Sequence, residues 1–170
     1  MIPTVKSLLR ATPKRYLVGL DAVVLTNVSA LNHDRRRGSV SSRGRKAQIG
    51  NVLGLYHPRW QGNKAWIELF VDNISKQWPD GKPASYMRID LTFAEVLYHE
   101  VGHHIHAQHL PEYRPKENVA DGWSERMTKR YMWRHHWETV LFLGPFILAR
   151  LAIRFLRQRI MAASRADSSR

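Results

Sequence analysis

The sequence contains no cysteine among its 170 residues, and this absence removes two kinds of chemistry. Disulfide bonds cannot form, and thiolates cannot serve as metal ligands. Any metal site must therefore be built from histidine and carboxylate side chains. The chain is long enough to bury a core, and its hydrophobic content of 44% is typical of a folded globular domain.

Long apolar runs are also scarce. The stretch TVLFLGPFILA ends at Arg150, well short of the roughly 20 residues that a membrane-spanning helix needs. The run YLVGLDAVVL contains Asp21 and is not followed by a small-residue cleavage site, so it is unlike a signal peptide. These features favour a cytoplasmic protein without a transmembrane span, with peripheral membrane association left open.

Acidic residues are outnumbered, and the excess positive charge lies in the two ends of the chain. The net charge is +13, from 27 Lys and Arg against 14 Asp and Glu. Residues 1–47 contribute +8, residues 48–149 are neutral, and residues 150–170 contribute +5. Basic ends suit nucleic acid, an anionic surface or an acidic partner, and solubilising tails have the same composition.

The expected elements run from strands to helices, which indicates an α+β fold. A short helix is expected around residues 5–10. The stretch 32–48 is rich in Gly, Ser and Arg and lacks periodicity, which predicts a loop. Runs of β-branched and other apolar residues predict strands within 16–31, 51–57 and 65–73.

Helical patterns fill the second half of the chain. The first helix is expected to begin at Thr92, whose capping box Glu95 completes, and to run to about Gln108. The second is expected to begin near Pro115 and to continue past Tyr131. An amphipathic helix over 146–163 should follow, either capping the core or lying on an anionic membrane.

The first of these helices carries the segment His99-Glu100-Val101-Gly102-His103. Residues four apart share a helix face, so His99 and His103 can both reach one metal ion. Glu100 is placed to act as a base on a water at that metal rather than to bind it. The alternative is a histidine-rich helix face without a metal, but placing these polar groups in an otherwise apolar helix carries a desolvation cost.

Two residues compete for the role of third ligand. His109 has the H-E-x-x-H-x-x-G-x-x-H spacing of metzincins, but His106 stands where that pattern has glycine. If the helix continues, His109 lies about 15 Å of axial rise beyond His99 and cannot share its metal. Glu117 on the following helix is the preferred candidate, and Asp121 one turn later can accept the other ring N–H of a ligand histidine.

The segments HEVGHHIH and ENVAD resemble the gluzincin zinc metallopeptidases, in particular the minigluzincin domains of the ImmA/IrrE type. The resemblance spans about residues 50–130. It implies a small zincin-like domain in which a short twisted sheet packs on the active-site helix and a glutamate helix follows. It also implies Zn²⁺ bound by His99, His103 and Glu117, with Asp121 behind them and Glu100 as general base.

The charge distribution along the chain and this resemblance together predict three regions and a function; the basic ends are departures that the family does not require. The three regions are a basic segment over 1–47 with a strand and an Arg/Ser/Gly-rich loop, a metallopeptidase core over 48–139, and a basic amphipathic helix over 140–170. The predicted function is a zinc-dependent metalloendopeptidase that cleaves a protein or peptide substrate through a zinc-activated water. The alternative is a non-catalytic or DNA-tethered zinc-binding module whose basic ends bind nucleic acid.

The strand over 65–73 is the candidate for binding such a substrate. Ile67 and Leu69 alternate with Glu68, as in a strand with one buried face, and the strand is either a sheet edge that aligns an extended peptide or an ordinary core strand. The residue that stabilises the developing oxyanion is not singled out by the sequence. The candidates for that role are Tyr113, His104, His135 and His136.

Overall fold

The computed structural model describes residues 1–42, 45–77, 85–109, 116–138 and 141, and its fold is α+β as predicted. It divides into two units, Met1–Tyr131 and Met132–Arg170, and both sheets belong to the first. The elements in chain order are α1 (Ile2–Ala11), η1 (Lys14–Tyr16), β1 (Leu20–Thr26), η2 (Val28–Ala30), α2 (His33–Arg37), β2 (Ser39–Ser42), β3 (Arg45–Gln48), η3 (Ile49–Asn51), β4 (Gly54–His57), β5 (Ala65–Phe70), α3 (Val71–Lys76), α4 (Ser85–His109) and α5 (Lys116–His135).

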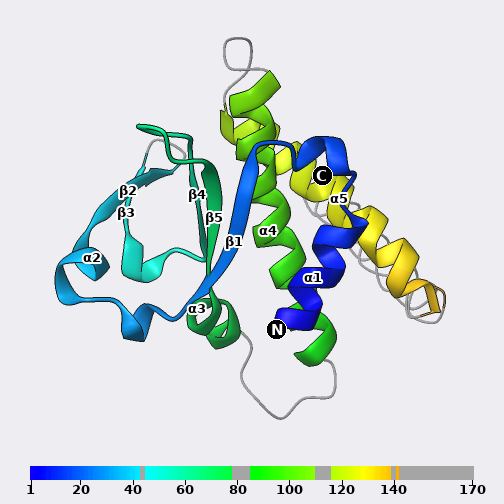
Figure 1. Ribbon diagram of the computed structural model, residues 1–170. Helices are drawn as coiled ribbons and strands as arrows, with labels where there is room; N and C mark the ends of the chain where they lie inside the picture. The colour runs from blue at the N-terminus through cyan, green and yellow to red at the C-terminus, as the bar shows by residue number, and fades with distance from the viewer. Residues whose placement is uncertain (43–44, 78–84, 110–115, 139–140, 142–170) are drawn as a thin grey trace, which may run out of the picture. The chain divides into compact units, whose positions relative to one another are not determined.

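The main sheet has three strands in the order β1-β5-β4 (Figure 1). β5 is parallel to β1 and antiparallel to β4, so β5 is the central strand. The prediction that β5 is a substrate-binding edge is therefore wrong, and the alternative of a core strand is correct. The expectation of one exposed face is wrong as well, because Glu68 is as buried as its neighbours Ile67 and Leu69. The strand also ends earlier than predicted, since α3 begins at Val71.

The helix α4 lies across one face of the sheet, and α1 packs against α4 (Figure 1). The buried side chains of α4 make up half of the core cluster: Phe93, Ala94, Val96, Leu97, Tyr98, Val101 and Ile105. The helix begins at Ser85 rather than at the predicted Thr92, which is buried inside it. The capping box is thus wrong: apolar residues on both sides of Thr92 keep the helix packed on the core. Its end at His109 is close to the predicted Gln108.

The stretch 32–48 is not the loop that its composition predicts. The Asn32 side chain accepts a hydrogen bond from the Arg35 N–H at 2.8 Å and caps α2, and the antiparallel pair β2–β3 follows. Arg35 also reaches the buried carboxylate of Glu68 on β5, with Nη2 2.6 Å from Oε2. This long-range ion pair, which no local pattern reveals, fixes the segment on the sheet.

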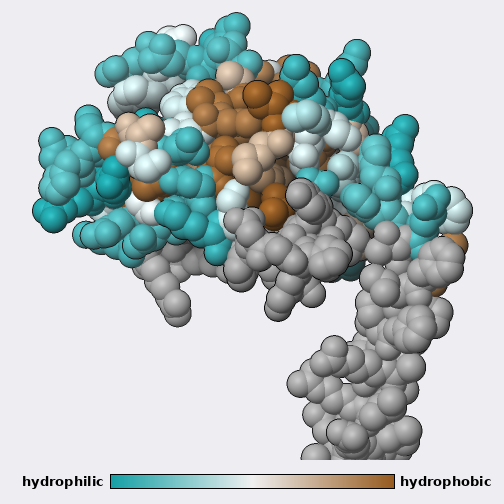
Figure 2. Space-filling model, turned by 90° about the horizontal axis from the view of Figure 1, so that it is seen from below, coloured by the Kyte–Doolittle hydropathy of each residue, from teal (hydrophilic) through white to brown (hydrophobic). Residues whose placement is uncertain are grey.

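Apolar side chains are not confined to the interior. Figure 2 shows them gathered in the middle of the face seen from below, with hydrophilic residues to the left and right of them. The first residue of α1 lies at this end (Figure 1), and Met1 and Ile2 are both exposed while Val5 and Leu8 pack on α4. No helix within the described ranges is long and apolar enough to cross a membrane. The amphipathic helix predicted over 146–163 lies outside the described residues, as does Tyr113.

Candidate metal centre

The metal-ligand candidates meet because α4 and α5 approach each other very closely. A Cβ atom added to Gly102 would lie 2.6 Å from the Cα atom of Ala120, so only glycine fits at this crossing. Ser124 on α5 further donates a hydrogen bond to the Glu95 carbonyl on α4 at 2.8 Å. The glycine of HEVGH and the alanine of ENVAD thus have one shared purpose, which is to let the first turn of α5 reach the histidines.

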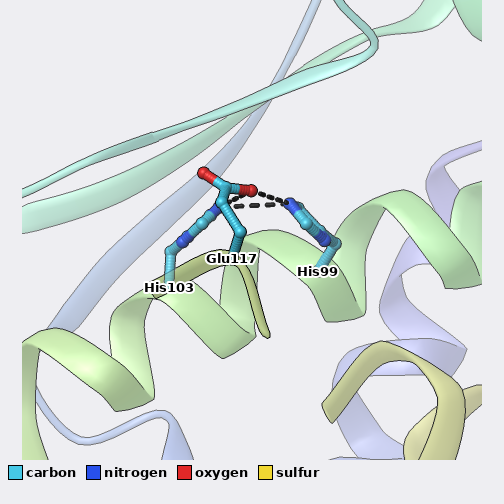
Figure 3. Close-up of side chains that lie close together, drawn as sticks. All are labelled: His99, His103 and Glu117. Carbon is cyan, nitrogen blue, oxygen red and sulfur yellow. Dashed lines mark hydrogen bonds and ion pairs between the residues drawn. The ribbon is translucent and has the colours of Figure 1, made fainter. Parts of the chain in front are cut away.

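His99, His103 and Glu117 point toward one another from these two helices (Figure 3). The two histidine Nε2 atoms are 3.1 Å apart, and Glu117 Oε2 lies 3.5 Å from that of His99 and 3.7 Å from that of His103. A tetrahedral zinc ion with ligand bonds of 2.0–2.1 Å requires about 3.3–3.4 Å between its ligand atoms. The three atoms therefore have the spacing of one face of such a tetrahedron, and the group could hold a metal ion.

The protonation of His99 supports the same conclusion. Its Nδ1 lies 3.0 Å from Asp121 Oδ1, and because the carboxylate can only accept, Nδ1 carries the proton. In the neutral ring Nε2 then presents a lone pair toward Glu117 and His103. His103 Nε2 lies 3.1 Å from this nitrogen, so either a proton or a shared cation can join the two rings. The donor set of two imidazoles and one carboxylate is one that zinc accepts.

Glu100 is buried beside this group, at the edge of the sheet. A Cβ atom on Gly54 of β4 would lie 3.2 Å from Glu100 Oε1, and the Tyr56 backbone N–H donates a hydrogen bond to the carboxylate. Burial raises the pKa of Glu100 to about 8; the Tyr56 hydrogen bond opposes the shift and the nearby Glu117 charge adds to it. A buried carboxyl group whose affinity for protons is raised is suited to general acid–base work.

His104, which the sequence offers for the oxyanion, has a different place. Its ring is buried, with Nε2 2.9 Å from the Val18 carbonyl oxygen and Nδ1 3.2 Å from the Tyr56 hydroxyl. Both ring nitrogens thus face other segments of the fold, which makes His104 a structural residue rather than an oxyanion donor. His135 and His136 lie in the second unit.

The rival third ligand, His109, belongs to the unbroken helix α4. In a continuous helix the backbone of His109 lies about 15 Å along the axis from that of His99, which is too far for the two side chains to share a metal ion. Within the described ranges, the group of ligand atoms that converges is His99, His103 and Glu117.

The sequence interpretation missed Gly54 and Tyr56. The signal that could have found them was the glycine inside a predicted strand, which often marks a close approach of backbone to another group. Comparison of the chain with protein-family models, with curated proteins and with solved structures finds no match. The function is therefore inferred from the geometry of His99, His103, Glu117 and Glu100.

Proposed function

We propose that the protein is a zinc-dependent metalloendopeptidase of the gluzincin type. The observation that carries this proposal is the convergence of three ligand atoms from His99, His103 and Glu117 next to the buried carboxylate of Glu100. A structural zinc site would normally fill all four positions with protein ligands, whereas three protein ligands with a nearby carboxylate are the arrangement of catalytic zinc sites.

The chain's own residues would divide the work between metal binding and proton transfer. His99, His103 and Glu117 hold the ion, and Asp121 keeps His99 in the tautomer whose Nε2 faces it. Bound zinc would supply Lewis-acid polarisation of the peptide carbonyl and acidify a water molecule. Glu100 takes the proton from the attacking water and passes it to the leaving amine nitrogen.

Because β4 and not β5 lies at an edge of the sheet, β4 is the better candidate for aligning a substrate. β4 is an outer strand of the three-stranded sheet, and it is the strand that reaches Glu100. An extended peptide adding to this edge by main-chain hydrogen bonds would run past the base. The substrate class is accordingly an unstructured or locally unfolded protein segment.

Zinc content tests the ligand set. We expect close to one zinc per chain after dialysis in the wild type and in His109→Ala, and loss of zinc in Glu117→Ala. Loss of zinc in His109→Ala with retention in Glu117→Ala would overturn the ligand assignment. Absence of zinc from all three proteins would remove the basis of the enzymatic proposal.

Hydrolysis of an unstructured protein such as casein tests the activity. Glu100→Gln is expected to retain zinc and to lose cleavage, because the amide cannot take up the proton of the water. Equal cleavage by wild type and Glu100→Gln would refute the mechanism, since a contaminating protease would then account for the activity.

Nucleic-acid binding is the second candidate, favoured by the net charge of +8 in residues 1–47. Part of this charge is used inside the fold, because Arg35 pairs with Glu68 and Arg36 donates to the carbonyls of Ser29 and Leu31. Retention on DNA or RNA that weakens steeply with salt would support this role. No retention at low salt would exclude it.

A further inference from the structure

We propose that Tyr56 and His104 are positioning residues for Glu100: His104 holds the Tyr56 side chain, and the Tyr56 backbone N–H holds the Glu100 carboxylate. The contacts stand by themselves, but the description of Glu100 as the base rests on the proposed function. Neither residue needs to touch substrate or metal for this role.

The pairing of β4 shows why the Tyr56 N–H can reach Glu100. Phe70 donates to the Leu53 carbonyl at 2.9 Å, and the register continues as Leu55 opposite Glu68 and His57 opposite Trp66. In an antiparallel pair every second residue exchanges both of its hydrogen bonds with the partner strand. The backbone groups of Gly54 and Tyr56 therefore point away from β5, toward the open edge where Glu100 lies.

Gly54 provides the space that this contact needs. A side chain there would meet Val96 Cγ1 at 2.8 Å and Glu100 Cγ at 3.1 Å. The missing Cβ lets the strand lie directly against α4 at the level of Glu100. The carboxylate thus lies beside the open edge of β4 at the level of Tyr56.

The Tyr56 side chain points to the same helix one turn further on. Its hydroxyl lies 3.2 Å from His104 Nδ1, and the two rings meet edge-on with centroids 5.6 Å apart. The Val18 carbonyl can only accept, so His104 Nε2 donates to it and, in the neutral ring, Nδ1 accepts from the tyrosine. Burial raises the pKa of Tyr56, which keeps this donor protonated.

Tyr56 is therefore fixed at two points on one face of α4, by its backbone at Glu100 and by its hydroxyl at His104. The carbonyl that orients His104 comes from the loop before β1, where Gly19 has a φ of +83°. That φ favours glycine, and a Cβ atom there would lie 3.2 Å from the end of the Gln108 side chain on α4. The position of the base is in this way set by residues on three separate segments of the chain.

The test is hydrogen exchange of individual backbone amides by NMR, in the full-length protein with and without zinc. Tyr56→Phe removes the one hydrogen bond that joins the two positioning residues and keeps the ring. Tyr98→Phe is the matched control, because Tyr98 is also buried, lies on α4, and donates to the Leu8 carbonyl of α1 at 3.2 Å.

We expect the amide of residue 56 to exchange about tenfold faster in Tyr56→Phe than in the wild type, the size of effect that one hydrogen bond can produce. The amides of residues 55 and 57, which bond to β5, should be unchanged. Tyr98→Phe should leave all three unchanged. Unchanged exchange at residue 56 in Tyr56→Phe, or equal acceleration in both variants, would overturn the proposal.

Casein cleavage separates positioning from simple destabilisation. Tyr56→Phe should retain zinc and KM and lose about tenfold in kcat, in the range known for groups that orient a catalytic residue. Tyr98→Phe should keep kcat even if its thermal stability falls equally. Unchanged kcat in an active Tyr56→Phe would refute the positioning role. If the wild type cleaves nothing, the proposed function fails, while the exchange experiment still decides whether His104 and Tyr56 hold Glu100.

Discussion

At the scale of single residues, the state of Glu100 depends on opposing forces. Its burial strongly favours the neutral acid, and the Tyr56 N–H favours the carboxylate but does not compensate fully, so the pKa rises to about 8. In a metal-free protein Glu100 is therefore mostly protonated at neutral pH. A cation bound to His99, His103 and Glu117 would lower the pKa of Glu100, because it favours the charged carboxylate.

This pKa makes the stability of the metal-free protein depend on pH. Between the unfolded-state pKa near 4.5 and the folded-state value of about 8, the folded chain binds a proton that the unfolded chain does not. Stability contributed by Glu100 is complete below the lower value and is lost as the pH rises, at up to about 1.4 kcal/mol per pH unit. Glu100→Gln lacks this loss, so its stability relative to wild type should increase from pH 5 to pH 8.

Urea unfolding in the presence of a chelator measures this difference at pH 5, 6.5 and 8. A stability difference between the two proteins that stays constant with pH would contradict the raised pKa. Groups distant from Glu100 titrate alike in the two proteins, so their contributions cancel.

Asp121 gives a second prediction at this scale. Replacing it by alanine removes the acceptor of the His99 Nδ1 proton, which lies 3.0 Å away, and leaves the ligand atoms in place. We expect the zinc affinity to fall about 10–100-fold. Glu125→Ala is the control, because Glu125 is an exposed acid on the same helix that pairs with Lys129. Chelator competition provides the affinities, and an equal fall in both variants would point to a general charge effect instead.

At the scale of elements, the crossing of α4 and α5 is controlled by one glycine. Gly102→Ala should force the helices apart, because the added Cβ would lie 2.6 Å from the Ala120 backbone. Gly122→Ala on α5 is the matched control, since a Cβ there meets nothing within 4 Å. Alanine is favoured over glycine inside a helix by about 0.8–1 kcal/mol. We therefore expect Gly122→Ala to raise the melting temperature and keep zinc.

Gly102→Ala should lower the melting temperature and lose zinc, because Glu117 moves away from the two histidines. Thermal unfolding and zinc analysis of the two variants side by side decide the question. Retention of zinc in Gly102→Ala would mean that the helices can separate without moving Glu117, and that the glycine crossing does not set the ligand spacing.

The helices and the ligand spacing could be predicted from the sequence because both follow from local rules. His99 and His103 share a face by helical periodicity, and the helix ends close to the predicted residue. The start of α4 was missed because tertiary packing extends the helix beyond the local cap at Thr92. The central position of β5 and the burial of Glu68 depend on partners far away in the chain, which periodicity does not record.

At the scale of the whole molecule, the sheet separates the metal-ligand group from a second polar cluster, which is centred on Glu68. Glu68 on β5 accepts from Arg35 at 2.6 Å and from Thr26 at 2.8 Å, and His57 lies 3.3 Å away. Glu68 alternates along β5 with the core residues Ile67 and Leu69, which pack with α4, so its side chain lies on the other face. Changes to this cluster should alter stability without altering metal binding.

Arg35→Ala tests this separation. It leaves the buried Glu68 carboxylate without its strongest donor, which we expect to cost about 1–3 kcal/mol. Arg37→Ala changes an exposed arginine on the same helix and should stay within about 0.5 kcal/mol of wild type. Urea unfolding gives the stabilities, and both variants should retain zinc. Loss of zinc in Arg35→Ala would show that the two faces of the sheet are coupled.

The origin of these contacts along the chain bears on how the protein is made. The three ligands come from two consecutive helices, so the contacts among them are close in sequence. The support of Glu100 is non-local: Tyr56 meets His104 across 48 residues, and His104 meets Val18 across 86. Because contacts close in sequence tend to form first, refolding should bring the three ligands together before Tyr56 and His104 fix Glu100. A chain caught at that stage would offer the three ligand side chains without a fixed Glu100 carboxylate beside them.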